Sequence, residues 1–144
     1  MTSPIQLNWS IKQSFVDYVR SHGTVEVAAP GRELDGQFCF PCAKSSPEIL
    51  RFVGSLGFDA HAGFLSATVA NPWLHIGPET SYITIDGSDP TRRQGPRLRL
   101  ADLPDMRPNH TFSGPHRTIL AETGAVLFDF RYPSGEPLAP IHIT

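Results

Sequence analysis

The sequence predicts one mainly β domain, an antiparallel sandwich or barrel-like sheet with a single N-terminal α-helix packed on it. Its 144 residues include fourteen prolines and twelve glycines, too many for a helical bundle but suited to short strands with frequent turns. Only one segment has a helical period, whereas several later runs alternate and end at turn residues. A chain of this length can bury a core without disulfides or metal, and no repeat or linker divides it. Residues 1–144 are therefore expected to form one domain.

The helical segment spans residues 8–23. Ser10 is the expected N-cap, and Gln13 three residues later completes a capping box. Gly23 is expected to stop the helix in the left-handed conformation. At about 100° per residue, one mostly apolar stripe contains Ile11, Phe15, Val19 and His22.

Two hydroxyl side chains lie at the edge of this stripe. Ser14 and Tyr18 have the i, i+4 spacing that makes neighbours on a helix surface. There they can face a cavity between the helix and the element on which it packs. From the helix alone, the simpler interpretation is a tyrosine at the core edge with its hydroxyl in water.

The rest of the chain is expected to form strands separated by turns. His61-Ala62-Gly63 lies between two apolar runs, as the turn of a hairpin would. Pro41 is expected to end a short strand that begins at Gln37, and Thr123-Gly124 is an expected turn. The expected strands are 24–28, 37–40, 52–58, 64–70, 73–76, 82–85, 97–103, 118–121, 125–130 and 138–143.

Charge and hydropathy exclude several classes of partner. The formal net charge of −2 gives no general attraction to nucleic acid or to an anionic membrane. No apolar run reaches the roughly 18 residues that a membrane span needs. The N-terminus lacks the basic and apolar regions of a secretory signal. As written, the chain is expected in the cytoplasm, or in a secreted or cell-envelope location if it is a trimmed domain.

The two cysteines, Cys39 and Cys42, form a lone C-x-x-C. A zinc site would need a second pair or two suitably spaced histidines, and the six histidines are scattered. A thioredoxin-like site would place the pair at a helix N-terminus after a strand. Here the surrounding residues resemble a strand that runs into Pro41, so two strand-end thiols are expected.

Motifs distributed from end to end resemble one known family. They are Leu7-x-Trp9-x-x-Lys12-x-Ser14-Phe15-x-x-Tyr18, Gly57-Phe58-x-Ala60-His61-x-Gly63-x-Leu65, Ala70-Asn71-Pro72-Trp73-Leu74-x-Ile76, Thr123-Gly124-Ala125-x-x-Phe128 and Tyr132-x-x-Gly135-x-x-Leu138-x-Pro140. In this order and spacing they resemble the HtaA haem-binding domain of actinobacterial haem-uptake proteins. The resemblance covers nearly the whole chain.

The resemblance implies a pentacoordinate ferric haem b with Tyr18 as the axial ligand of the iron. It also implies that His61 lies nearby on the hairpin, that Ser14 touches a propionate and that Phe128 forms an aromatic wall of the pocket. A phenolate is a hard anionic donor that suits ferric iron. A histidine that donates a hydrogen bond to the phenolate would stabilise the anion and tune the iron.

Each of these residues also has a simpler interpretation. His61 could be only a turn residue, Ser14 could bond its own i−4 carbonyl, and Phe128 could be core. Four arginines could reach haem propionates if their loop folded over the pocket, although a solvated loop is the simpler expectation: Arg92, Arg93, Arg97 and Arg99.

The preferred functional hypothesis is a non-enzymatic haem-binding protein for trafficking, transport or storage, with possible donor or acceptor proteins. One alternative is a peroxidase-like or catalase-like enzyme, which would need a distal acid/base pair, and no His-Arg pair has motif spacing. Another is a β-sandwich interaction module that has lost haem, against which the presence of both Tyr18 and His61 argues. Uptake members of the family usually carry a signal peptide, repeated domains and an anchor, and this sequence departs from them there. No pattern indicates an oligomeric state.

Overall fold

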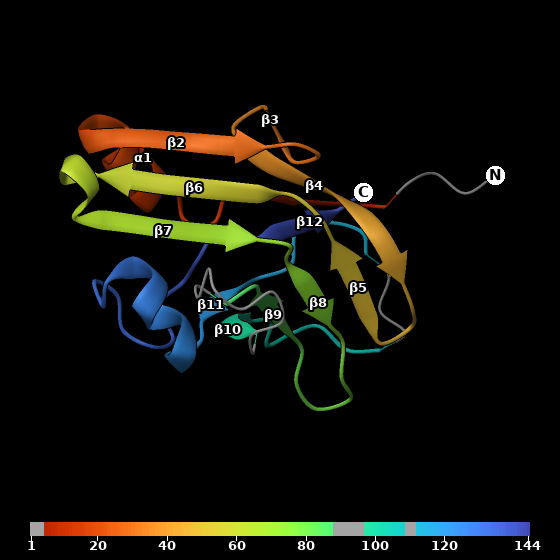
Figure 1. The fold of residues 1–144 in the computed structure, drawn as a ribbon. Helices are drawn as coiled ribbons and strands as arrows, with labels where there is room; N and C mark the ends of the chain where they lie inside the picture. The colour runs from red at the N-terminus through yellow and green to blue at the C-terminus, as the bar shows by residue number, and fades with distance from the viewer. Residues whose placement is uncertain (1–4, 88–96, 109–111) are drawn as a thin grey trace.

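Two antiparallel sheets dominate the computed structural model, which describes residues 5–87, 97–108 and 112–144 (Figure 1). The mainly β class with an N-terminal helix is thus confirmed. The larger sheet has nine strands in the order β11-β10-β9-β8-β5-β4-β1-β12, with β3 beside β4, and the smaller sheet has the order β2-β6-β7. The larger sheet contains β1 (Gln6–Trp9), β3 (Arg32–Leu34), β4 (Gln37–Ser45), β5 (Ile49–Phe52), β8 (Trp73–His75), β9 (Tyr82–Ile85), β10 (Leu98–Asp102), β11 (Ile119–Leu120) and β12 (Ile141–Ile143). The smaller sheet contains β2 (Gly23–Ala28), β6 (Ser55–Ala60) and β7 (Leu65–Ala70), and the helical elements are α1 (Gln13–His22), η1 (His61–Gly63) and η2 (Glu122–Phe128).

The larger sheet is curled, so that its two ends approach each other. Isolated bridges join Ile119 to Pro137 and His116 to Ile141, which links the β11 end of the sheet to the β12 end. Of the two architectures expected from the sequence, this sheet follows the barrel-like one. Among the described residues, none of the helices combines the length and the apolar character needed to cross a membrane.

The helix begins later than the sequence predicted, so the capping box at Ser10 is wrong. Residues 6–9 form β1, and Ile11 turns the chain with φ 64° before α1 starts at Gln13. Lys12 is the N-cap, in extended conformation and with no side-chain cap hydrogen bond. The pairing of β1 with both β4 and β12 holds this segment as a strand and outweighs the local capping signal.

Gly23 has a different role from the predicted left-handed stop. Its φ is −178°, which is extended, and it is the first residue of β2, paired with Ala60. A Cβ at Gly23 would lie 1.8 Å from the carbonyl oxygen of Asp59. Glycine is required here because the end of the helix and β6 approach so closely.

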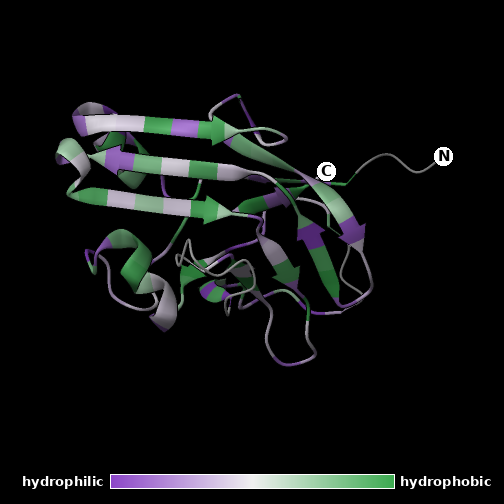
Figure 2. Cartoon of the chain, in the orientation of Figure 1, coloured by the Kyte–Doolittle hydropathy of each residue, from purple (hydrophilic) through white to green (hydrophobic). Residues whose placement is uncertain are grey.

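The apolar face of α1 packs on β6 and forms one end of the core. Phe15 and Val19 are fully buried, and the ring of Phe15 makes edge-to-face contacts with Phe58 and Phe128, with centroid distances of 5.2 and 4.8 Å. Figure 2 shows how hydrophobic and hydrophilic residues alternate along the small sheet, as expected for strands with one buried face. His22, the last member of the predicted stripe, is exposed.

Pro41 does not end its strand, contrary to the prediction. The strand β4 continues to Ser45 because its partner changes from β1 to β5 near Pro41. Pro41 accepts a hydrogen bond from the N–H of Val53 at 3.0 Å, and the N–H of Cys42 donates to Ile5 at 2.8 Å. Because β4 changes its partner strand from β1 to β5 here, the sheet needs no hydrogen-bond donor from residue 41.

The predicted strand at residues 125–130 is also wrong. This segment forms the 3-10 helix η2, followed by Asp129 and Phe130 in the left-handed region with φ of 53° and 57°. Ala125 and Phe128 are buried, and a spacing of three residues places them on the same side of such a helix. A short apolar run does not by itself distinguish this arrangement from a strand.

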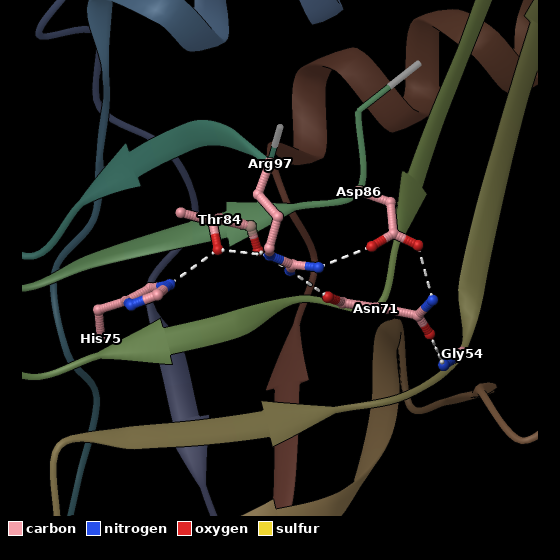
Figure 3. Close-up of polar contacts among 6 residues, drawn as sticks. All are labelled: Gly54, Asn71, His75, Thr84, Asp86 and Arg97. Carbon is pink, nitrogen blue, oxygen red and sulfur yellow. Dashed lines mark hydrogen bonds and ion pairs between the residues drawn. The ribbon is translucent and has the colours of Figure 1, made fainter. Parts of the chain in front are cut away.

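A polar network joins the two sheets at the turn between β7 and β8 (Figure 3). Asn71, with φ 50°, accepts a hydrogen bond from the N–H of Gly54 at 3.2 Å and donates to Asp86 at 2.8 Å. Arg97 donates to the carbonyl of Asn71 at 2.5 Å, to Asp86 at 2.6 Å and to Thr84 at 2.9 Å. The Asn71-Pro72 turn of the sequence motif is therefore a structural junction.

Candidate functional site

Three segments meet at one end of the small sheet and bring polar side chains together. They are α1, the η1 turn between β6 and β7, and the chain that follows η2. Figure 1 shows α1 behind this end of the sheet and η2, in blue, beside β7. Tyr18, His61 and Arg131 come from these three segments, and all three side chains meet at the phenol oxygen of Tyr18.

The first contact joins Tyr18 to His61, 43 residues apart in sequence. The phenol oxygen lies 2.5 Å from Nε2 of His61. His61 and Ala62 both have positive φ, 54° and 55°, and this tight turn presents the imidazole at the tip of the hairpin. The predicted hairpin turn at 61–63 is confirmed, and the structure places two of the predicted site residues in direct contact.

Arg131 supplies the second contact to the same oxygen. Its Nη2 donates a hydrogen bond to the phenol oxygen of Tyr18 at 2.8 Å, and its guanidinium carbon lies 4.4 Å from the centroid of the Tyr18 ring. The sequence does not predict this residue as part of the site. It follows a segment that the sequence assigns to the wrong element, and no local pattern connects it to a helix 113 residues away.

His22 is the fourth member of the cluster. Its ring lies 4.9 Å from the ring of His61 at an interplanar angle of 28°, and 4.8 Å from the ring of Tyr18 at 52°. The helical spacing had placed His22 on the apolar stripe. It instead stacks beside the site, one turn after Tyr18.

The other two predicted site residues lie further from this contact. Ser14 is exposed, one helical turn before Tyr18. Phe128 is fully buried, and its ring contacts are with Phe15 and with Tyr132, whose centroid is 5.5 Å away. Phe128 therefore packs in the core behind α1, and its predicted role as a pocket wall stays a prediction.

Exposed apolar side chains gather in the same segments. Four large hydrophobic residues are exposed in the described part of the chain. Phe64, which follows η1 directly, is 92% exposed, and Phe130, which precedes Arg131, is 72% exposed. Val126 of η2 is 54% exposed, and only the fourth, Leu34, belongs to an element outside these segments. Exposed apolar surface beside a polar cluster is typical of a ligand-binding or interaction site.

Of the four arginines that could have reached a ligand, two lie in described segments, and both pair with carboxylates. Arg97 pairs with Asp86 and Arg99 with Asp102. Arg92 and Arg93 lie outside the residues that the structure describes.

The two cysteines are free thiols on β4. Residues three apart on a strand point to opposite faces, so Cys39 and Cys42 are not placed to pair. Burial raises the pKa of the Cys39 thiol, which favours its protonated, unreactive form. Within the described ranges, no group of three or more His, Cys, Asp or Glu residues could hold a metal ion.

The cluster presents one phenol oxygen with an imidazole and a guanidinium beside it. An ionised Tyr18 would be a hard ligand of the kind that ferric iron prefers. An imidazole and a guanidinium within hydrogen-bond distance of its oxygen would stabilise the negative charge.

Comparisons with known proteins identify the family and the fold. The family model HtaA, described as Htaa, matches residues 5–144. The fold is similar to that of the C-terminal domain of HtaA from Corynebacterium glutamicum, with a TM-score of 0.78 and 22% identity over 98% of this chain and 94% of that one. It is also similar to the N-terminal domain of HtaA (TM-score 0.74, 20% identity, 99% and 96% covered) and to the haem-binding protein HtaB (0.71, 20%, 98% and 93%), both from the same organism. No curated protein sequence matches the chain.

Proposed function

The chain belongs to the HtaA family, and from that premise we propose that it binds haem through Tyr18 as the axial ligand of the iron. The hydrogen bond between Tyr18 and His61 carries the proposal, because it joins the two residues that the family resemblance assigns to the ligand and its partner. The bound group is proposed to be ferric haem b. The proposed role is haem trafficking, transport or storage, with haem itself as the ligand and with donor or acceptor proteins as partners. The fold similarity to the haem-binding protein HtaB supports this proposal.

The donor set at the site fits a haem with ferric iron. Tyr18 offers one hard oxygen, and His61 and Arg131 both reach that oxygen. When bound, the haem would supply an iron centre whose fifth ligand is the phenolate. The large exposed side chains Phe64 and Phe130 offer apolar surface that a porphyrin face could cover, at about 25 cal/mol for each Å² removed from water.

His61 is placed to accept the phenol proton of Tyr18. Tyr18 binds iron as a phenolate, so its O–H bond must break. Nε2 of His61, at 2.5 Å, is within reach of that proton and can accept it. The resulting imidazolium then donates the same hydrogen bond back to the phenolate, which keeps the proton in the site and the anion stabilised.

Binding is preferred to catalysis because of where the polar side chains point. His61 and Arg131 both contact the ligating oxygen itself. A peroxidase-like reaction would instead need an acid/base pair over the opposite, open face of the iron. Ser14, exposed one turn before Tyr18, is proposed to touch a propionate, and Phe128 to support the pocket from the core.

Titration of the purified protein with hemin, followed by absorption spectroscopy, tests the proposal. We expect the wild type to give a high-spin ferric spectrum with a tyrosinate charge-transfer band. Tyr18→Phe should lose that band and bind hemin at least about 100-fold more weakly, since loss of the ligand costs more than loss of a supporting residue. Tyr82→Phe is the matched control, because it removes a phenol hydroxyl from β9 and should leave the spectrum unchanged. Equal binding and equal spectra for the Tyr18 variant and the wild type would overturn the assignment of the ligand.

A further inference from the structure

We infer that Arg131 is a positioning residue that fixes the phenol oxygen of the proposed ligand Tyr18 and faces it, beside His61, with a permanent positive charge. This inference rests on the proposed haem site and names a residue to which neither the motifs nor the comparisons assign a role. Arg131 touches the ligand tyrosine and acts on the iron only through it.

Arg131 and Tyr18 make a double contact. Nη2 of Arg131 donates to the phenol oxygen of Tyr18 at 2.8 Å, while the guanidinium carbon lies 4.4 Å from the ring centroid. Both contacts become stronger when the phenol is ionised, because the oxygen and the ring then carry more negative charge. The guanidinium can only donate, so the phenol hydrogen is free to point at His61.

The charge of Arg131 is available to the phenol oxygen. Arg20, Arg97 and Arg99 each pair with a carboxylate. In the part of the chain that the structure describes, no carboxylate lies within ion-pair distance of Arg131. The guanidinium carries its charge permanently and has no acceptor atom, so it can face the phenol oxygen only as a charged donor.

The backbone holds Arg131 in place. The N–H of Arg131 donates to the carbonyl of Phe128 at 3.1 Å, and the N–H of Phe130 donates to Ala125 at 3.0 Å. Asp129 and Phe130 both take left-handed φ values, which turn the chain sharply at the end of η2. The turn thus directs Arg131 toward α1, and it also leaves Phe130 exposed beside it.

The test compares Arg131→Gln with the wild type in the haem complex. Without the cation, the phenolate electrons lie higher in energy, so we expect the charge-transfer band to move to longer wavelength and the ferric/ferrous potential to fall. Transfer of haem to excess apomyoglobin should become roughly 10-fold to 100-fold faster, as expected for the loss of a charged hydrogen bond. Arg131→Lys keeps the charge but loses the planar contact, and should lie between the two.

Arg20→Gln is the matched control. It removes a guanidinium that lies on α1 near Tyr18 but pairs with Glu33 instead. It should leave the band, the potential and the transfer rate unchanged. Urea unfolding of the haem-free variants checks that they fold, which the exposed position of Arg131 leads us to expect.

The outcomes separate this inference from the proposed function. An Arg131→Gln complex with the wild-type band overturns the inference, even if its haem is released faster, because the effect would then be structural. Wild-type protein that binds no hemin overturns the proposed function and this inference with it. Normal wild-type binding with an unmoved band in both Arg131 variants overturns the inference alone.

Discussion

At the scale of single residues, one oxygen atom organises the candidate site. The phenol oxygen of Tyr18 has His61 on one side and Arg131 on the other, and the ring of His22 stacks on that of His61. Two nitrogen-bearing side chains from different segments thus reach the same phenol oxygen. The two partners differ in kind, since His61 can take or give a proton and Arg131 cannot.

The contribution of His61 can be measured by His61→Gln. The amide cannot accept the phenol proton and become a cation, so the phenolate should lose part of its stabilisation. We expect hemin affinity to fall by about 10-fold to 100-fold while the tyrosinate band is retained, as is usual when a supporting partner of a metal ligand is removed. His142→Gln on β12 is the control and should bind as the wild type does. If His61→Gln binds hemin with wild-type affinity, the proposed role of His61 is wrong.

At the scale of the elements, the close approach of β2 and β6 sets the distance between helix and hairpin. Gly23 directly follows α1 and begins β2, where it pairs with Ala60, the residue before His61. The site is therefore built across a contact in which no side chain fits at Gly23. This is why the glycine that the sequence assigned to a helix stop has a direct bearing on the site.

Gly23→Ala tests this geometry. The added Cβ would lie 1.8 Å from the Asp59 carbonyl oxygen, so β2 and β6 must separate or shift. We expect the free energy of unfolding to fall by about 2 kcal/mol or more, measured by urea denaturation, and hemin binding to weaken as His61 moves. Gly57→Ala is the control on β6, because a Cβ there meets no atom within 4 Å. Similar losses for the two variants would contradict the account.

The polar network of Figure 3 gives the larger sheet a pH dependence through His75. Burial, followed by the charges of Arg97, Arg51 and Arg99, lowers the pKa of His75, whose Nε2 lies 2.8 Å from Thr84 Oγ1. The unfolded chain therefore takes up this proton at a higher pH than the folded protein does. The stability that the neutral ring contributes is present above about pH 6.5 and is lost as the pH falls toward the lowered folded-state value.

Urea unfolding at pH 7.5 and pH 5.5 checks this expectation. The wild type should lose more stability between the two pH values than His75→Gln, in which the titrating group is absent. All other titrating groups are common to the two proteins, so the difference reports His75. Equal losses would show that His75 does not titrate differently in the folded and unfolded states.

At the scale of the whole molecule, the two ends of the chain close the fold. The strand β12 pairs with β1, and the indole N–H of Trp9 donates to the carbonyl of Ala139 at 2.7 Å. The curl that brings β11 toward β12 arises from contacts between residues distant in sequence. Local alternation predicts the strands, but it does not show how a sheet closes.

The same distinction explains which parts of the site could be predicted. The hairpin turn at 61–63 follows from Gly63 and the flanking apolar runs. Helical spacing predicts only that Tyr18 lies at the edge of the apolar stripe, and its role as a ligand is what the family resemblance implies. Arg131 and His22 could not be assigned to the site, because their partners come from elements that meet only in the folded structure. Phe128 was placed on a strand because its short apolar run suits a strand as well as a 3-10 helix.

Resonance Raman spectroscopy of the ferric hemin complex, excited in the charge-transfer band, tests the central claim most directly. The chain has three tyrosines, so the ligand can be assigned by single substitutions. We expect phenolate vibrations in the wild type, in Tyr82→Phe and in Tyr132→Phe, and their complete loss in Tyr18→Phe. Phenolate vibrations that persist in Tyr18→Phe, or that are absent from the wild-type complex, would contradict the claim.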